Sequence, residues 1–275
     1  MIYSDRHRFV FVHIPKCAGT SVRRALAAHD DSGGRFGGRI VEHPRHGRVD
    51  WTHLPLALMA ELAPEVFARL ADPAYLGIAL LRDPFERFPS ALAQRIKMYR
   101  GVEMAQIGRA ALEAEIEAVI ARLEAEPAVT EAGFIHFARQ VDFVEHEGRR
   151  LLDALVPVER LDLLAALLGA RIGAPLPPIG QENPTRMARW PALRPALRLG
   201  GRAARALLPG NAGERMRRRA RTLLLRPASA GLSPVFDSAR VRDFVARHYA
   251  ADLALHRQAL ADAGGGGPAG GRPAG

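Results

Sequence analysis

Short apolar runs alternate along the chain with stretches of helical periodicity. The runs from about Arg8 to Ile14, Tyr75 to Leu81 and Leu151 to Val158 are nearly continuous, which is typical of buried strands. Helices are predicted over 20–28, over 56–70 with an interruption near residue 64, from 84 onward, and over 110–126, 161–168 and 241–256. This alternation predicts an α/β fold in a single domain, with a central parallel sheet flanked by helices.

The first apolar run ends in a loop suited to an anion. This loop reads His13-Ile14-Pro15-Lys16-Cys17-Ala18-Gly19-Thr20-Ser21 and leads into the first predicted helix. Lys16 supplies a positive charge, and Gly19 would let a ligand approach the backbone closely. Thr20 or Ser21 can cap the helix and still offer a hydroxyl. Because a first helical turn has unpaired N–H groups, a phosphate or sulfate group fits here.

The loop is not the phosphate loop of nucleotide triphosphatases. That motif has two glycines five residues apart with a lysine directly after the second, whereas Lys16 precedes Gly19 and no glycine comes earlier. A tight connection from strand to helix with an exposed lysine remains the alternative. A second cationic cluster elsewhere in the chain is therefore needed to distinguish an anion-binding loop from a purely structural connection.

A second cationic cluster follows the next apolar run. Arg82 comes directly after Leu81, so it is expected at the carboxyl end of a strand. Asp83 suits a helix N-cap and Pro84 the first helical position. Glu86, three residues after the cap, is expected to close a capping box.

The helix after Asp83 has two faces. The spacing predicts a buried stripe of Phe85, Phe88, Leu92, Ile96 and Tyr99, and places Arg87, Ser90 and Gln94 on another face. Arg82 and Ser90 can thus converge on one anion. Ligands of open parallel sheets bind outside the carboxyl ends of the strands, so both clusters lie where a ligand is expected. The architecture is then similar to that of nucleotide kinases.

The two clusters resemble the donor site of sulfotransferases that use 3′-phosphoadenosine 5′-phosphosulfate (PAPS). Residues 13–21 look like their 5′-phosphosulfate loop, and Arg82 through Arg87 to Ser90 looks like their 3′-phosphate site. The similarity is greatest to the branch with carbohydrate 2-O-sulfotransferases and bacterial sulfotransferase family 2 proteins. It covers about residues 8–260, with a poorly matched interval between about 186 and 235.

The resemblance implies roles for individual residues. The phosphosulfate would be held by Lys16, Cys17, Ala18, Gly19, Thr20 and Ser21. Arg82 and Ser90 would hold the ribose 3′-phosphate, and Arg186 would reach the donor from a late basic loop. Sulfuryl transfer, like phosphoryl transfer, requires alignment and charge stabilisation on the departing phosphate, which Lys16 would provide as a catalytic residue. This transfer needs no metal.

His53 is the expected base that accepts the proton of the acceptor hydroxyl. Relatives place a catalytic histidine, often followed by x-Pro, between their two donor motifs, and His53 is followed by Leu54 and Pro55. Imidazole titrates near neutrality, so it can take this proton without a large pKa shift. His43 and His46 are the alternative bases.

Other polar groupings remain open. His43, His46 and His53 are residue types that can bind a metal, but no carboxylate or Cys cluster accompanies them in the sequence. His136 and Gln140 lie one turn apart if their segment is helical. Their side chains would then either form hydrogen bonds in the core or contact the substrate, and the sequence leaves both roles open.

The net charge of +10 has one source. Residues 186–226 contain twelve Arg and one acid, Glu214, whereas the remaining 27 basic and 28 acidic residues nearly cancel. This segment is interpreted as an acceptor-binding wall for an anionic glycan, as a contact to a membrane surface or nucleic acid, or as a solvated insertion. Trp190 is its only aromatic residue, so no specific nucleic-acid recognition is expected.

Domain organisation and compartment follow from composition. We expect a sulfotransferase domain over residues 1–262, with an Arg-rich insertion at about 186–235, and a flexible Gly/Pro-rich tail over 263–275. The single Cys17 excludes an intramolecular disulfide and fits a reducing compartment. The sequence shows neither an apolar run of transmembrane length nor a signal peptide. A cytoplasmic enzyme of bacterial type is therefore expected.

Two functions from different classes stay open. The first is an enzyme that moves sulfate from PAPS to a hydroxyl of a carbohydrate, a lipid or another small acceptor and releases adenosine 3′,5′-bisphosphate. The second is a catalytically silent protein that binds polyanions through the Arg-rich segment. A nucleotide kinase is disfavoured by the order of Lys16 and Gly19. Neither the acceptor nor the oligomeric state can be derived from the sequence.

Overall fold

The computed structural model describes residues 1–177, 179, 186–188, 225–227 and 233–265. The chain divides into two compact units. The larger unit comprises Met1–Glu182 and Ser238–Gly275, and the smaller comprises Asn183–Asp237.

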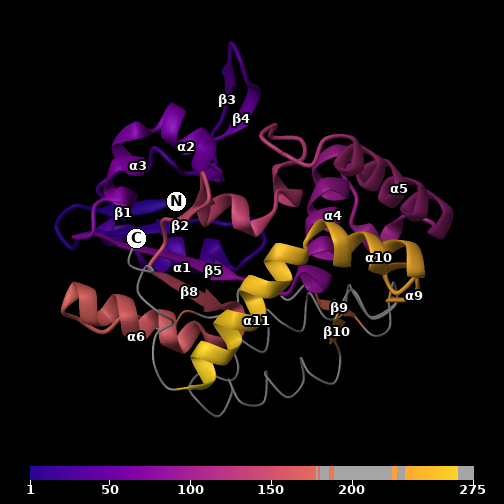
Figure 1. Ribbon diagram of the computed structural model, residues 1–275. Helices are drawn as coiled ribbons and strands as arrows, with labels where there is room; N and C mark the ends of the chain where they lie inside the picture. Colours follow the sequence, from indigo (N-terminus) through magenta and orange to yellow (C-terminus); the bar gives the residue numbers. More distant parts are fainter. Residues whose placement is uncertain (178, 180–185, 189–224, 228–232, 266–275) are drawn as a thin grey trace, which may run out of the picture. The chain divides into compact units, whose positions relative to one another are not determined.

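A four-stranded sheet forms the centre of the larger unit (Figure 1). Its strands, in spatial order, are β1 (Ile2–Ser4), β2 (Phe9–Val12), β5 (Leu76–Leu81) and β8 (Ala154–Pro157). The last three run parallel, and β1 pairs antiparallel with β2. The predicted α/β class with a mostly parallel sheet flanked by helices is confirmed. β1 was not predicted, because three residues are too few to show a periodicity.

The strand register brings three carboxyl ends to one edge of the sheet. Val12 is the register partner of Ala79, and Leu81 is the partner of Pro157. Every residue of β2 and β8 is buried, which explains why these strands read as continuous apolar runs. The loop after β2 and Arg82 after β5 therefore leave the sheet at the same edge.

Helices cover the sheet and extend beyond it. They are α1 (Gly19–Ala25), α2 (Leu56–Leu62), α3 (Pro64–Ala71), α4 (Pro84–Arg100), α5 (Arg109–Ala125), α6 (Leu161–Ile172), α10 (Ala239–His248) and α11 (Ala250–Gly264). Short 3-10 helices are η1 (Ala27–His29), η2 (Met104–Gln106), η3 (Ile135–Phe137), η4 (Gln140–Phe143) and η5 (Val158–Arg160). Two hairpins are β3 (Ile40–His43) with β4 (Gly47–Asp50), and β6 (Glu145–His146) with β7 (Arg149–Arg150).

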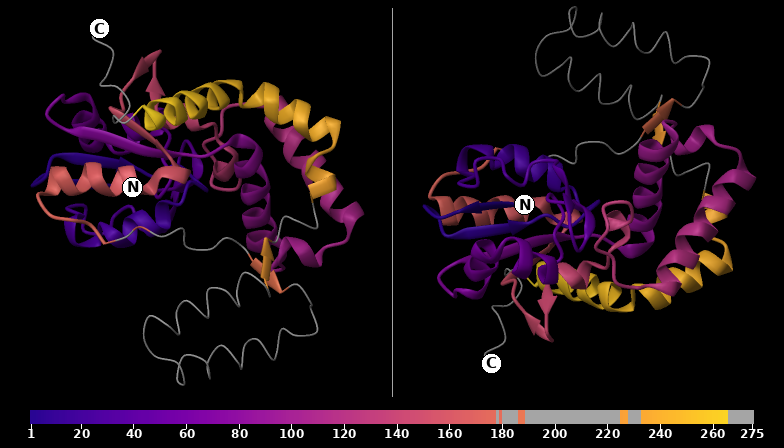
Figure 2. Two further views of the ribbon diagram at one scale, coloured as in Figure 1. Left: turned by 90° about the horizontal axis from the view of Figure 1, so that it is seen from below. Right: turned by 90° about the horizontal axis from the view of Figure 1, so that it is seen from above.

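The packing of these helices links distant parts of the chain. α3 contacts β2, while α6 and α11 contact β8. α10 contacts α4 and continues into α11, as both views of Figure 2 show. The single helix predicted over 241–256 is wrong, because α10 ends at His248 and α11 begins at Ala250. Between them, the buried Tyr249 donates its hydroxyl to the carbonyl oxygen of Phe137 at 2.8 Å.

The buried face of α4 differs from the predicted stripe. Phe88, Leu92 and Ile96 are buried, but Tyr99 is 52% exposed. Arg87, expected on a polar face, is only 2% exposed. Its guanidinium donates to the carbonyl oxygens of Ala138 at 2.7 Å and His136 at 3.2 Å, and lies 3.6 Å from a carboxylate oxygen of Asp252. These partners compensate the burial of its charge.

The smaller unit contains a two-stranded sheet. β9 (Arg186–Ala188) pairs antiparallel with β10 (Leu225–Pro227), and α9 spans Ser233–Phe236. Residues 189–224, which hold most of the Arg-rich segment, lie outside the described residues, as do 266–275 of the predicted tail. The predicted domain boundaries stay a prediction. Within the described residues, no helix combines the length and the apolar character needed to cross a membrane.

Candidate active site

The loop after β2 places a lysine in an unusual backbone conformation. Lys16 and Ala18 have φ angles of 65° and 58°, in the left-handed region that non-glycine residues rarely adopt. Such residues in a turn direct backbone N–H groups into a concave site for anions. The half-buried Lys16 donates from Nζ to Oε1 of Gln94 at 3.4 Å. Burial lowers the pKa of Lys16, and the nearby charge of Arg82 lowers it further.

Gly19 is required by a neighbouring side chain. It is the first residue of α1, and a Cβ at this position would lie 1.9 Å from Cδ2 of His13. Glycine is thus required at position 19 because the His13 ring lies against it. The sequence did not reveal this reason. The prediction that Thr20 or Ser21 caps α1 is wrong, because Ala18 occupies the N-cap. Thr20 is exposed in the first turn, and Ser21 is buried.

Arg82 lies next to the Lys16 loop. Its Nη1 is 3.5 Å from the carbonyl oxygen of Lys16, while Nε and Nη2 donate to Oε2 of Glu86 at 3.3 and 3.2 Å. The predicted capping box is therefore wrong, since Glu86 pairs with Arg82 instead of the helix N-terminus. Asp83 does cap α4, accepting from the N–H of Phe85 at 2.8 Å.

α4 contributes polar groups to the same region. Ser90 and Gln94 are one turn apart and both half-buried, and Gln94 contacts Lys16. Cys17 is buried, and its thiol donates to Oε1 of Gln140 at 3.3 Å. The structure thus brings Lys16, Cys17 and Arg82 together, with Ser90 on the helix that touches Lys16.

His53 is buried beside the same loop. Its Nδ1 lies 2.9 Å from the carbonyl oxygen of His13, and its ring centre is 4.4 Å from that of His13 and 5.6 Å from that of His136. A carbonyl oxygen only accepts, so Nδ1 carries the proton and the neutral ring keeps a lone pair on Nε2. Burial lowers the pKa of His53 to about 3, and the charge of Lys16 contributes. The imidazole is therefore neutral at physiological pH, with an unprotonated Nε2 that is less basic than that of an exposed histidine. The expectation that His53 acts without a large pKa shift is wrong, because the ring is buried.

The alternative histidines lie elsewhere. His43 and His46 are on the β3–β4 hairpin, which projects from the sheet in Figure 1, and their rings stack at 5.0 Å. His46 contacts Glu61 at 3.0 Å. The structure therefore separates His43 and His46 from the neighbours of His53. In the described part of the chain, no three His, Cys, Asp or Glu side chains are grouped so that they could hold a metal ion.

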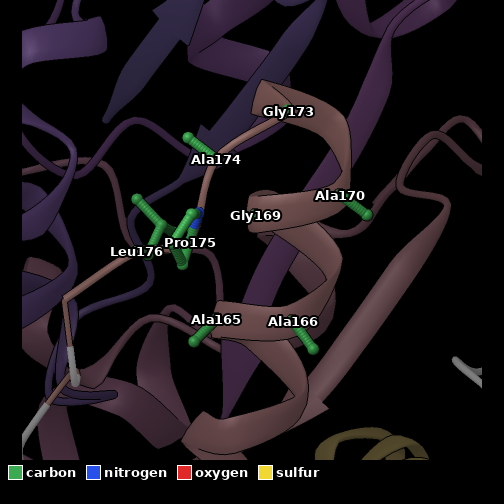
Figure 3. A pocket seen from close by; sticks show the side chains of 8 residues that line it. All are labelled: Ala165, Ala166, Gly169, Ala170, Gly173, Ala174, Pro175 and Leu176. Carbon is green, nitrogen blue, oxygen red and sulfur yellow. The ribbon is translucent and has the colours of Figure 1, made fainter.

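Two further features are an arginine of the smaller unit and a hollow on α6. Arg186 begins β9 of the smaller unit. Its side chain is not among the parts that the structure describes, so its role stays a prediction. A hollow of about 550 Å³ lies on α6, lined by Ala165, Ala166, Gly169, Ala170, Gly173, Ala174, Pro175 and Leu176 (Figure 3). Its small apolar side chains offer no group for acid–base or anion chemistry, and none of the candidate site residues lines it.

His136 and Gln140 were expected one helical turn apart, with core hydrogen bonding and substrate contact both open. They do not share one helical turn, because η3 ends at Phe137 and η4 begins at Gln140. Gln140 makes core hydrogen bonds to Cys17 and Arg82, whereas His136 lies beside His53. Their spacing in the sequence gave no indication of these separate neighbours.

The fold and the site define a class of protein. A parallel sheet with a cationic loop after one strand and an arginine after the next is suited to a ligand with more than one anionic group. The chain belongs to the sulfotransferase family, whose model, described as "Sulfotransferase family", matches residues 1–150. This match includes Lys16, His53, Arg82 and Gln140, confirms the predicted family, and supports sulfuryl transfer as the reaction class. Searches of curated proteins and of solved structures gave no match.

Proposed function

We propose that the protein transfers the sulfuryl group of PAPS to a hydroxyl of a carbohydrate or another small acceptor and releases adenosine 3′,5′-bisphosphate. The observation that carries this proposal is the 3.5 Å approach of the Arg82 guanidinium to the backbone of Lys16. Two cations from neighbouring strand ends, both of them half-buried, favour a ligand that brings two negative groups. The P-loop-like character of the fold is part of this proposal.

Donor binding would divide between the two cations. Lys16, with Cys17, Ala18, Gly19, Thr20 and Ser21, would hold the 5′-phosphosulfate, and Arg82 with Ser90 would hold the 3′-phosphate. The carboxylate of Glu86 now partly neutralises Arg82. A 3′-phosphate would replace Glu86 at this guanidinium, which is feasible because an exposed ion pair contributes only about 0–1 kcal/mol.

The transfer itself needs a proton acceptor and a stabilised leaving group. The acceptor oxygen forms a bond to sulfur while the bond from sulfur to the 5′-phosphate oxygen breaks, and the electron pair stays on the phosphate. Nε2 of His53 would take the hydroxyl proton, and Lys16 would stabilise the charge on the departing phosphate. Nδ1 of His53 donates to the His13 carbonyl, which holds the ring in the tautomer that this role requires.

The test is transfer of labelled sulfate from PAPS. Purified protein is incubated with the donor and separate panels of glycans, lipids and small alcohols, and products are read by label and by mass. A sulfated product that depends on His53 supports the proposal. Tight binding of the bisphosphate without turnover on any acceptor would favour the catalytically silent alternative. Cytoplasmic residence also belongs to the proposal and is tested by fractionation of cells that produce the protein.

A further inference from the structure

We propose that Gln140 is a positioning residue that sets the spacing between the two anion-binding groups of the donor site. This inference rests on the proposed function and extends it to a residue outside both donor motifs. Gln140 begins η4 and is fully buried, so it does not itself reach solvent or a ligand.

The side-chain amide of Gln140 pairs with both backbone groups of Arg82. Oε1 accepts from the N–H of Arg82 at 2.9 Å, and Nε2 donates to its carbonyl oxygen at 2.8 Å. The ladder between β5 and β8 ends at the partners Leu81 and Pro157, so Arg82 is the first residue beyond it. The amide therefore continues the pairing of β5 by one residue and restrains the backbone from which the guanidinium extends.

The same amide oxygen also holds the Lys16 loop. The Cys17 thiol donates to Oε1 of Gln140 at 3.3 Å. Burial raises the pKa of Cys17 to about 12, so the thiol keeps its proton and remains a donor. One oxygen thus accepts from the residue after Lys16 and from Arg82, which joins the ends of β2 and β5 through a single atom.

Gln140 is itself held by the far end of the chain. Its backbone N–H donates to Oδ2 of Asp252 at 2.7 Å, and the N–H of Val141 donates to Oδ1 at 3.0 Å. Asp252 belongs to α11 and lies 3.6 Å from the buried guanidinium of Arg87. This framework leaves the Gln140 amide little freedom to follow a displaced loop.

The spacing matters because the donor would be gripped at two points. A ligand with two linked charges gains affinity over either single charge only if both contacts form without distortion. Changing the length of residue 140 should reduce that gain and leave the affinity for each single phosphate nearly unchanged. A residue that only stabilises the fold would affect all three ligands in the same proportion.

The test compares three nucleotides on four proteins. Affinities for adenosine 3′,5′-bisphosphate, adenosine 5′-monophosphate and adenosine 3′-monophosphate are measured by calorimetry on wild type, Gln140→Asn and Gln140→Glu. Ile116→Ala, in the buried face of α5, serves as a control that lowers stability without touching the site. Thermal unfolding of each protein identifies variants that fail to fold.

We expect Gln140→Asn, one methylene shorter, to weaken the bisphosphate by about tenfold or more and each monophosphate by less than about threefold. Gln140→Glu removes the donor to the Arg82 carbonyl at constant length and should show a smaller loss of the same kind. Equal losses for all three nucleotides, or no loss in either variant, would overturn the role of Gln140. A wild type that binds the bisphosphate no better than a monophosphate would instead refute the proposed function, and the spacing role with it.

Discussion

Nδ1 of His53 lies 2.9 Å from the backbone carbonyl oxygen of His13, in the segment that joins β2 to the Lys16 loop. This contact attaches the proposed base to the proposed donor loop and leaves Nε2 of His53 as the basic nitrogen. The orientation of the base and the position of the loop are therefore coupled through one hydrogen bond.

His53→Asn should abolish proton transfer and leave donor binding nearly unchanged. General-base catalysis contributes about 10²–10⁴-fold, so we expect a loss of turnover of that size. The measurement is initial-rate kinetics with a competent acceptor, together with calorimetric binding of adenosine 3′,5′-bisphosphate. His43→Asn and His46→Asn are the comparison variants, and a larger loss in either would make that residue the base.

The buried His53 and the half-buried His136 should make stability depend on pH. Burial lowers the pKa of both His53 and His136 to about 3, against an ordinary value of 6.5. Below pH 6.5 the unfolded chain binds protons that the native state does not, so stability is complete above 6.5 and decreases as pH falls toward 3. The slope is about 1.4 kcal/mol per pH unit for each additional proton bound.

This pH dependence is measured by urea unfolding between pH 5 and pH 7.5. The free energy of unfolding of wild type should fall on acidification, and His136→Asn should reduce the slope. An unchanged slope in this variant would mean that His136 is accessible to protons in the native protein.

Gly19→Ala should destabilise the protein through a clash with His13. The new Cβ would lie 1.9 and 2.1 Å from two ring atoms, so the ring or the loop must move. Overpacking of this kind costs about 1–3 kcal/mol, and urea unfolding measures it. Gly108→Ala is the matched control, because its Cβ would meet nothing within 4 Å. Combining Gly19→Ala with His13→Ala should recover part of the loss, and a fully additive double variant would exclude the clash.

Glu86→Gln should strengthen binding of the bisphosphate. The carboxylate of Glu86 competes with a 3′-phosphate for Arg82, and neutralising it removes a like charge next to the ligand. We expect an affinity gain of about threefold to tenfold, decreasing at high salt. Glu113→Gln alters the equivalent surface pair with Arg109 and should change nothing. Weaker binding in Glu86→Gln would show that Glu86 orients Arg82 for the ligand.

Three strands of the sheet and the cationic residues that follow them could be predicted from the sequence, because their signals lie within short stretches of the chain. Continuous apolar runs gave β2, β5 and β8; Arg82 directly follows β5, and Lys16 lies in the loop after β2. Asp83 and Pro84 marked the start of α4 for the same reason, since an N-cap contact spans only a few residues.

What the sequence did not show depends on partners far along the chain. Arg87 was expected on a polar face, but its partner Asp252 lies on α11. The glycine at position 19 was interpreted as space for a ligand, whereas the His13 ring fills that side. For Gln140, core hydrogen bonding and substrate contact were both open, and the structure shows its amide bonded to the backbone of Arg82. No periodicity encodes such pairings.

Calorimetry with adenosine 3′,5′-bisphosphate tests the two-point donor site most directly. Wild type should bind this nucleotide at least about tenfold more tightly than adenosine 5′-monophosphate or adenosine 3′-monophosphate. Arg82→Ala should lose the advantage over the 5′-monophosphate, and Lys16→Ala should lose the advantage over the 3′-monophosphate. Arg109→Ala, an exposed arginine on α5, should bind like wild type. Equal affinity of wild type for the bisphosphate and either monophosphate, or an advantage that survives the matching substitution, would contradict a site built from Lys16 and Arg82.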